Sequence, residues 1–345
     1  MPRPAPYRRR LIESPMKKTV STTLAFTLLA TAAFAAAPDF KAEPKWSKPA
    51  KGQDAIGNLH GDVAVAANGE VFVSCVSGPN AGVQVFDAAG NYLRNVPGAP
   101  NDFHGFVIHK NKEGEFIYGS RLSGQSILKM KLDGTVVLTI DAAKGVPDKF
   151  KRKGRGKNAK PALRLTAVDV APNGDIFATD GYANGYVHRF DRKGKYLASF
   201  GGRGRAPYNF STLHKICIDS RFSPPRILGC DRENLRVVHM SLDGDFLGVV
   251  ANDLMFPAAI VVQGDLAAVG EIGGRVALLD KRGNVVKKIG YNDVQSERKN
   301  NKTPPKLWRP GIVTAPHGVD FNAAGDLFVA EYSVFGRIHR FNRAK

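Results

Sequence analysis

Three histidines recur at one position of a pattern that repeats along the chain. His104, His214 and His317 each lie two residues before the first of two alternating apolar residues. The pattern has six copies, and the residues at this position are, in chain order, Gly61, His104, Thr166, His214, Ala258 and His317. Histidine therefore occupies every second copy.

If the six copies close into a ring, alternate copies are about 120° apart and their equivalent residues converge on the axis. Three imidazoles placed in this way would form a three-histidine site with an open position, which is typical of catalytic zinc. We therefore predict a zinc site at His104, His214 and His317. The alternative is a wet channel lined by polar residues without metal. His60 is out of register by one residue, and the predicted site omits it.

Further polar residues follow the second strand of several copies, where they would surround the same point. They are Arg121, Tyr182, Arg232 and Tyr332. A tyrosine has an unperturbed pKa near ~10, so it acts as a base only where a metal or an arginine favours its phenolate. An arginine can hold a substrate carboxylate through two parallel hydrogen bonds. We predict Tyr182, Arg232 and Arg121 as catalytic residues; the alternative for Tyr182 and Arg232 is a structural pair that bridges two blades.

The elements that would position these residues are short strands separated by turn residues. Each copy contains two apolar-alternating strands, a third strand, an Asp-x-x-Gly turn and a fourth strand, at a spacing of ~40 to 60 residues. This pattern predicts an all-β fold, a six-bladed β-propeller with four antiparallel strands in each blade. The last copy ends after its third strand at Ile338–Phe341. We expect the segment Phe40–Trp46 to supply the missing strand and to close the ring.

The first residues are predicted to be a signal peptide, residues 1–35. Lys17 and Lys18 precede an apolar run from Leu24 to Phe34 that is too short to span a membrane. Translation could also begin at Met16. Residues 36–345 are then a single propeller domain, and the protein is exported to the periplasm or the extracellular space, without a transmembrane segment.

The chain is strongly basic, with a formal net charge of +19. Removal of residues 1–35 leaves +14, and the excess is concentrated in loops 144–164 and 298–309. These loops could bind an acidic partner, although solvated loops without a partner are the alternative. Export makes nucleic acid an unexpected partner, and we expect a monomer. Cys75, Cys217 and Cys230 each lie in an apolar strand and are predicted to be buried thiols.

Four short motifs resemble those of NHL-repeat propellers and, within them, of peptidyl-α-hydroxyglycine α-amidating lyase. The likeness runs from His104 to Phe341. The motifs are Phe103–Gly105, Asp180–Asn184, Asp231–Arg236 and Pro316–Gly318. Asp-Gly-Tyr-x-Asn and Asp-Arg-Glu-Asn at this separation are more specific than a generic NHL repeat requires.

The resemblance implies a role for each predicted site residue. It implies that His104, His214 and His317 bind a catalytic zinc, that Tyr182 is the general base and that Arg232 lies in the active site. The reaction implied is cleavage of a carbinolamide to an amide and glyoxylate, so the substrate is a small molecule or a peptide C-terminus that carries a carboxylate.

The sequence departs from that family at three positions. No basic residue occupies the first-blade turn at 76–80, where the family has a substrate-gripping arginine, and Arg121 is the candidate replacement. Gly318 stands where the family has a calcium-binding aspartate, so a structural calcium ion is not expected. Ala183 replaces a disulfide cysteine.

Two other functions compete with a lyase. One is a non-enzymatic propeller whose basic loops bind an acidic partner. The other is a lactonase-like hydrolase, but such sites usually use acidic and Asn metal ligands, and here histidines hold the position.

Overall fold

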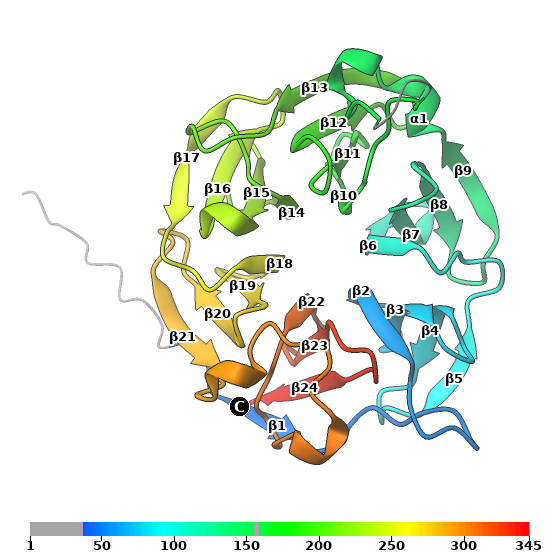
Figure 1. Cartoon of the computed structure of the whole chain (residues 1–345), viewed down its shortest axis with the longest axis vertical. Coiled ribbons are helices and arrows are strands. Elements are labelled where there is room, and N and C mark those ends of the chain that lie inside the picture. The colour runs from blue at the N-terminus through cyan, green and yellow to red at the C-terminus, as the bar shows by residue number, and fades with distance from the viewer. Residues whose placement is uncertain (1–36, 155–158, 345) are drawn as a thin grey trace, which may run out of the picture. The chain divides into compact units, whose positions relative to one another are not determined.

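The structure, a computed structural model, describes residues 37–154 and 159–344. These residues form six antiparallel sheets of four strands each, arranged as blades around a common centre (Figure 1). The predicted six-bladed β-propeller is thereby confirmed. The predicted signal peptide lies outside the described residues.

Each blade is one run of four consecutive strands, except the last. Blades 1 and 2 contain β2 (Asn58–Val65), β3 (Val71–Ser77), β4 (Gly82–Phe86), β5 (Tyr92–Asn95), β6 (Phe103–Asn111), β7 (Gly114–Arg121), β8 (Ile127–Lys131) and β9 (Val136–Ile140). Blades 3 and 4 contain β10 (Ala167–Val170), β11 (Ile176–Thr179), β12 (Tyr186–Phe190), β13 (Tyr196–Gly201), β14 (Leu213–Asp219), β15 (Arg226–Asp231), β16 (Arg236–Ser241) and β17 (Phe246–Ala251). Blades 5 and 6 contain β18 (Pro257–Gln263), β19 (Leu266–Glu271), β20 (Arg275–Leu279), β21 (Val285–Ile289), β22 (Pro316–Phe321), β23 (Leu327–Glu331), β24 (Ile338–Arg343) and β1 (Phe40–Glu43).

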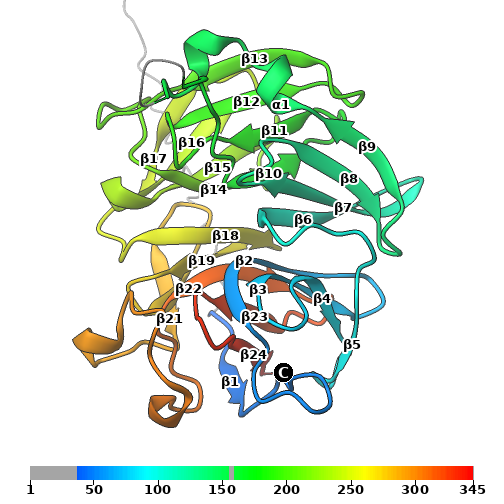
Figure 2. The same cartoon turned by 45° about the vertical axis from the view of Figure 1, so that its right-hand side comes forward.

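The first strand of every blade lines the centre of the ring. Figure 1 shows β2, β6, β10, β14, β18 and β22 innermost, and the oblique view in Figure 2 shows β6 to β9 running outward as one twisted blade. Side chains at equivalent positions of these six strands therefore approach one another, although they are far apart in the sequence.

The hydrophobic core is divided among the gaps between neighbouring blades. The described residues form six buried clusters, and each combines residues from two adjacent blades. Phe106 and Ile117 of blade 2, for example, pack with Phe72 of blade 1. Because each blade buries its apolar faces against its neighbours, the blades depend on closure of the ring.

The ring is closed by the N-terminal strand, as predicted. β1 pairs antiparallel with β24, with Phe40 opposite Arg343 and Glu43 opposite Arg340. Trp46, just after β1, packs edge-on against Phe328 at a ring-centroid distance of 5.1 Å. β1 thus covers an otherwise unpaired sheet edge and joins the two ends of the described chain.

The Asp-x-x-Gly turns between third and fourth strands have a local explanation. In blade 3 the carboxylate of Asp191 accepts hydrogen bonds from the backbone of Lys193 and Lys195, at 2.8 and 2.9 Å. Gly194 has φ +86°, a conformation that glycine adopts without steric cost.

Short helices lie only in the connections of the described chain. They are α1 (Ala142–Gly145) and the 3₁₀ turns Asp148–Phe150, Arg232–Asn234, Gln295–Glu297 and Pro305–Leu307. No helix among the described residues is long and apolar enough to cross a membrane. Cys75, Cys217 and Cys230 are buried and free, as predicted.

Candidate functional site

A β-bulge places each of the three predicted histidines on the axis. His104 on β6, His214 on β14 and His317 on β22 each lie where the pairing with the second strand shifts register. A bulge inserts an unpaired residue and re-aims its side chain, which explains why these histidines leave the alternation of their strands.

The three imidazoles converge, as the repeat predicts. The ring centroids are 4.8 Å apart for His104 and His214, 4.9 Å for His104 and His317, and 4.7 Å for His214 and His317. All three side chains are buried. The structure therefore brings the three predicted histidines together.

The odd-numbered blades hold each histidine in place through the same repeat position. Nδ1 of His104, His214 and His317 lies 2.8, 2.6 and 2.8 Å from the backbone oxygens of Thr166, Ala258 and Gly61, respectively. A carbonyl oxygen only accepts, so each Nδ1 carries the proton and each Nε2 keeps its lone pair. Such a bond to the second ring nitrogen is the usual support of a metal-binding histidine.

Burial keeps the three imidazoles neutral. It lowers the pKa of His104, His214 and His317 well below the ordinary value, and the neighbouring imidazoles and Arg232 lower it further. In the described part of the chain, the Nε2 atom of His317 is buried and has no hydrogen-bond partner. A neutral imidazole with a free Nε2 is the form that binds a metal ion.

His60 joins this cluster although it is out of register by one residue in the repeat. Its ring centroid lies 5.0 Å from those of both His104 and His317. Ligand atoms of these three residues lie within 4.8 Å of one another. Leu59 and Val63 on β2 pair with Cys75 and Val73 on β3. Between these two pairs, β2 contains two more residues than β3, and the strand bends there, at His60. Burial lowers the pKa of His60 to about 4.

The hydroxyl of Tyr182 lies among the histidines. It is 3.0 Å from Nε2 of His214, 3.2 Å from Nε2 of His104 and 3.5 Å from Nε2 of His60. Burial raises the pKa of Tyr182, and Arg232 opposes this rise, because its guanidinium donates to the hydroxyl at 3.3 Å. Tyr182 is thus adjacent both to the Nε2 atoms of the histidines and to a positive charge.

The Asp-Gly-Tyr motif shapes the loop that presents Tyr182. The carboxylate of Asp180 accepts from the backbone of Arg164 at 2.6 Å and of Asn184 at 3.2 Å. A Cβ at Gly181 would lie 2.3 Å from the backbone oxygen of Leu213, so only glycine fits there. The motif therefore encodes a turn that packs tightly against the neighbouring blade.

The Asp-Arg-Glu-Asn-x-Arg motif supports Arg232 in a similar way. Asp231 is buried and accepts hydrogen bonds from the side chains of Asn234 and Arg236, at 2.7 and 2.8 Å. Arg232 donates through Nε to Glu233 at 2.9 Å, and its guanidinium lies 5.4 Å from the centre of the Tyr182 ring.

Of the other two predicted residues, Tyr332 reaches the cluster and Arg121 does not. The ring of Tyr332 lies 4.4 Å from that of His60 and 6.0 Å from that of His317. Arg121 bonds Asp102 through Nε at 2.8 Å. Within the described residues, no hydrogen bond or ion pair links Arg121 to the histidines or to Tyr182, so its predicted role finds no geometric support.

Three arginines that the sequence analysis did not select line a cavity beside Tyr182. The cavity has a volume of about 470 Å³ and is lined by Arg152, Arg164, Gly181, Tyr182, Arg203 and Thr212. Arg164 is also close enough to lower the pKa of His60, after burial and Arg232. All three arginines lie in loops, which lack the repeating pattern of the strands. The basic charge of loop 144–164 was the sequence signal for Arg152 and Arg164, and no signal pointed to Arg203.

A buried ion pair lies in the channel behind the histidines. The ammonium of Lys215 on β14 donates to Asp62 on β2 and, at 3.3 Å, to the backbone oxygen of Phe106 on β6. Burial alone disfavours the ammonium, but Asp62 raises the pKa of Lys215, so the lysine is charged. Lys215 thus places a positive charge among the first strands of three blades.

Comparison with known proteins supports the resemblance predicted from the motifs. No family model matches the chain. The chain is 28% identical over 237 residues to peptidyl-alpha-hydroxyglycine alpha-amidating lyase 1 from Drosophila melanogaster, a match that covers 56% of this chain. The chain spans 40% of the length of that relative.

Solved propeller structures resemble the fold. A virginiamycin B lyase from Staphylococcus aureus superposes with a TM-score of 0.56 and 14% identity, covering 88% of this chain and 99% of that protein. A gluconolactonase from Xanthomonas campestris gives a TM-score of 0.58 and 12% identity, covering 90% of this chain and 98% of that protein. At these identities the likeness concerns the fold alone.

Proposed function

We propose that this protein is a zinc-dependent lyase of the amidating-lyase type, which cleaves the C–N bond of a carbinolamide to give an amide and glyoxylate. The observation that carries the proposal is the position of the Tyr182 hydroxyl, 3.2 and 3.0 Å from Nε2 of His104 and His214. The 28% identity to an amidating lyase supports the choice of this reaction.

His104, His214 and His317 would hold the zinc ion. Their Nδ1 atoms donate hydrogen bonds to backbone oxygens, so the three Nε2 atoms remain available as ligands. This arrangement agrees with a zinc site of three histidine nitrogens. A bound zinc ion would act as a Lewis acid on the substrate hydroxyl and favour its deprotonated form. His60 borders this position as a fourth imidazole.

Tyr182 would take the proton of the substrate hydroxyl. Arg232 donates to the phenol oxygen at 3.3 Å and so favours the phenolate that a base requires. The electron pair of the O–H bond forms the carbonyl of glyoxylate while the C–N bond breaks. The proton on Tyr182 can then return to the amide nitrogen, which balances the reaction.

Arg232 would also contact the substrate carboxylate. Its Nε is bound to Glu233, and Nη1 points to the reacting tyrosine. A substrate carboxylate next to the scissile bond would therefore lie beside the Arg232 guanidinium, which also donates to the Tyr182 hydroxyl. The proposal further includes export by residues 1–35 and action as a monomer on a small molecule or a peptide C-terminus.

The test is glyoxylate release from α-hydroxyhippurate by the purified protein loaded with zinc. Tyr182→Phe removes the proton acceptor and is expected to lower kcat by at least about 100-fold, with unchanged zinc content. Tyr291→Phe removes a hydroxyl outside the site and should keep wild-type activity.

Wild-type kcat in Tyr182→Phe would contradict the assigned role. A zinc-loaded wild-type protein that releases no glyoxylate would contradict the assigned reaction. A protein that binds neither zinc nor the probe would favour the non-enzymatic binding module instead.

A further inference from the structure

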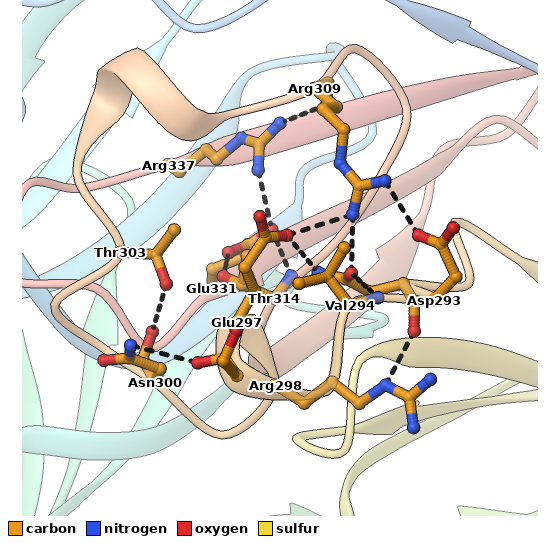
Figure 3. Close-up of polar contacts among 12 residues, drawn as sticks. Asp293, Val294, Glu297, Arg298, Asn300, Thr303, Arg309, Thr314, Glu331 and Arg337 are labelled. Carbon is orange, nitrogen blue, oxygen red and sulfur yellow. Dashed lines mark hydrogen bonds and ion pairs between the residues drawn. The ribbon is translucent and has the colours of Figure 1, made fainter.

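The two basic loops of the chain use their arginines differently. In the second basic loop, residues 298–309, the guanidinium of Arg309 pairs with Asp293 at 2.8 Å and with Glu297 at 3.0 Å. Figure 3 shows these contacts, together with the bond from Arg298 to the backbone and the contact of Arg337 with Glu331. These arginines stabilise the connection between blades 5 and 6, and carboxylates neutralise the charges of Arg309 and Arg337 within the protein.

The arginines beside Tyr182 have no such partners. Arg152, Arg164 and Arg203 are exposed and line one cavity, yet none forms an ion pair with a carboxylate of the described residues. Arg152 and Arg164 come from the first basic loop, residues 144–164, and Arg203 comes from the loop after β13. Three like charges around one cavity repel one another, and this repulsion is relieved when an anion binds between them.

Asp180 lies within electrostatic reach of Arg152 and Arg164 but forms no ion pair with either of them. Asp180 is buried under the loop, and its oxygens already accept hydrogen bonds from the backbone of Arg164 and Asn184. Burial raises the pKa of Asp180 to about 7, so its carboxyl group is only partly charged at neutral pH. The cavity therefore keeps a net positive charge.

The cavity adjoins the reacting position. Tyr182 is part of both the histidine cluster and the cavity, because its hydroxyl lies among the histidines and the residue also lines the cavity. Arg164 is within electrostatic reach of His60 in the histidine cluster. A molecule whose hydroxyl reaches Tyr182 can therefore extend into the space between the three arginines.

We propose that the substrate carries a second carboxylate, on the acyl part that becomes the amide product, and that this group binds between Arg152, Arg164 and Arg203. The inference rests on the proposed lyase function and specifies its substrate class: acidic N-acyl derivatives of α-hydroxyglycine. Guanidinium groups fit a carboxylate through paired hydrogen bonds, which lysines in the same places could not provide.

The first experiment compares two probes that differ only in this charge. They are α-hydroxyhippurate and its analogue with a carboxylate at the para position of the benzoyl ring. The wild-type protein is expected to have a kcat/KM for the acidic probe that is higher by about 10- to 100-fold, as one or two charge-assisted hydrogen bonds would give.

The double variant Arg152→Gln/Arg203→Gln should abolish this preference and leave kcat/KM for α-hydroxyhippurate nearly unchanged. Arg205→Gln is the matched control, because Arg205 lies two residues from Arg203 in the same loop, is exposed and does not line the cavity. It should keep the preference. Equal kcat/KM for both probes in the wild type, or an unchanged preference in the double variant, would overturn the proposal.

A binding measurement separates this proposal from the lyase assignment. Terephthalate, a dicarboxylate that cannot react, is titrated calorimetrically into the wild type and both variants, with benzoate as the reference. Terephthalate that binds at least about 10-fold more tightly than benzoate, with the difference lost only in the double variant, supports the arginine site even if no probe is cleaved. Equal binding of the two ligands overturns it.

Discussion

Lys215 offers a quantitative test of how the channel is held together. Its ammonium and the carboxylate of Asp62 form an ion pair between β14 and β2, and their side chains are only 7% and 3% exposed. Lys215→Met has a similar volume but leaves Asp62 buried and without its charged partner.

The expected cost follows from this burial. Removal of one partner of a buried ion pair costs about 3 to 5 kcal/mol, because the remaining charge stays uncompensated. An exposed pair is worth about 0.2 to 1 kcal/mol. Lys144→Met provides the matched control, since Lys144 and its partner Asp141 have side chains that are 88% and 47% exposed. The double variant Lys215→Met/Asp62→Asn removes both charges and should recover most of the lost stability.

The assay is chemical denaturation at pH 7 of the four proteins, with the free energy of unfolding taken from each transition. We expect a large loss of stability for Lys215→Met, a small loss for Lys144→Met and recovery in the double variant. A Lys215→Met protein that loses no more stability than Lys144→Met, or a double variant as unstable as Lys215→Met, would refute this expectation.

Two further predictions concern the loop that carries Tyr182. Burial raises the pKa of Asp180 from 3.8 to about 7, so the folded state holds this proton to a higher pH than the unfolded chain. The contribution of Asp180 to the free energy of unfolding is therefore largest below pH 3.8 and declines as the pH rises towards 7, by about 4 kcal/mol in total. Asp180→Asn should flatten the pH dependence of the free energy of unfolding between pH 5 and 8, measured by denaturation. Asp320, whose pKa is also raised to about 7 by burial, should keep part of the slope. Gly181→Ala would place its Cβ 2.3 Å from a backbone oxygen of β14 and is expected to displace Tyr182, which lowers kcat for glyoxylate release at least about 10-fold while zinc content stays constant.

The sequence was sufficient for the blades because alternation and turn chemistry are local. The predicted strand Ile338–Phe341 lies within β24 (Ile338–Arg343). Closure by the N-terminal segment followed from counting strands, since one copy lacked its fourth. The three histidines could be found because β6, β14 and β22 have a bulge at the same place. Each histidine therefore lies at the same distance in sequence from the apolar residues that follow it.

What the sequence did not reveal depends on irregular backbone. His60 reaches the cluster only because β2 contains two extra residues, which a fixed register cannot anticipate. Its position directly before Gly61 in the aligned slot was the available signal. Arg152, Arg164 and Arg203 lie in loops whose paths are set by tertiary packing, whereas Arg121, at a regular strand end, is bound by Asp102.

The central claim is that three imidazoles from alternate blades share one metal ion. The most direct test is the metal content of the purified protein, measured by mass spectrometry after dialysis against a defined trace of zinc. The account predicts about one zinc per chain in the wild type and in the His109→Ala control, and none in His104→Ala/His214→Ala. A folded wild-type protein that retains no metal, or a double variant that retains as much zinc as the control, would contradict it.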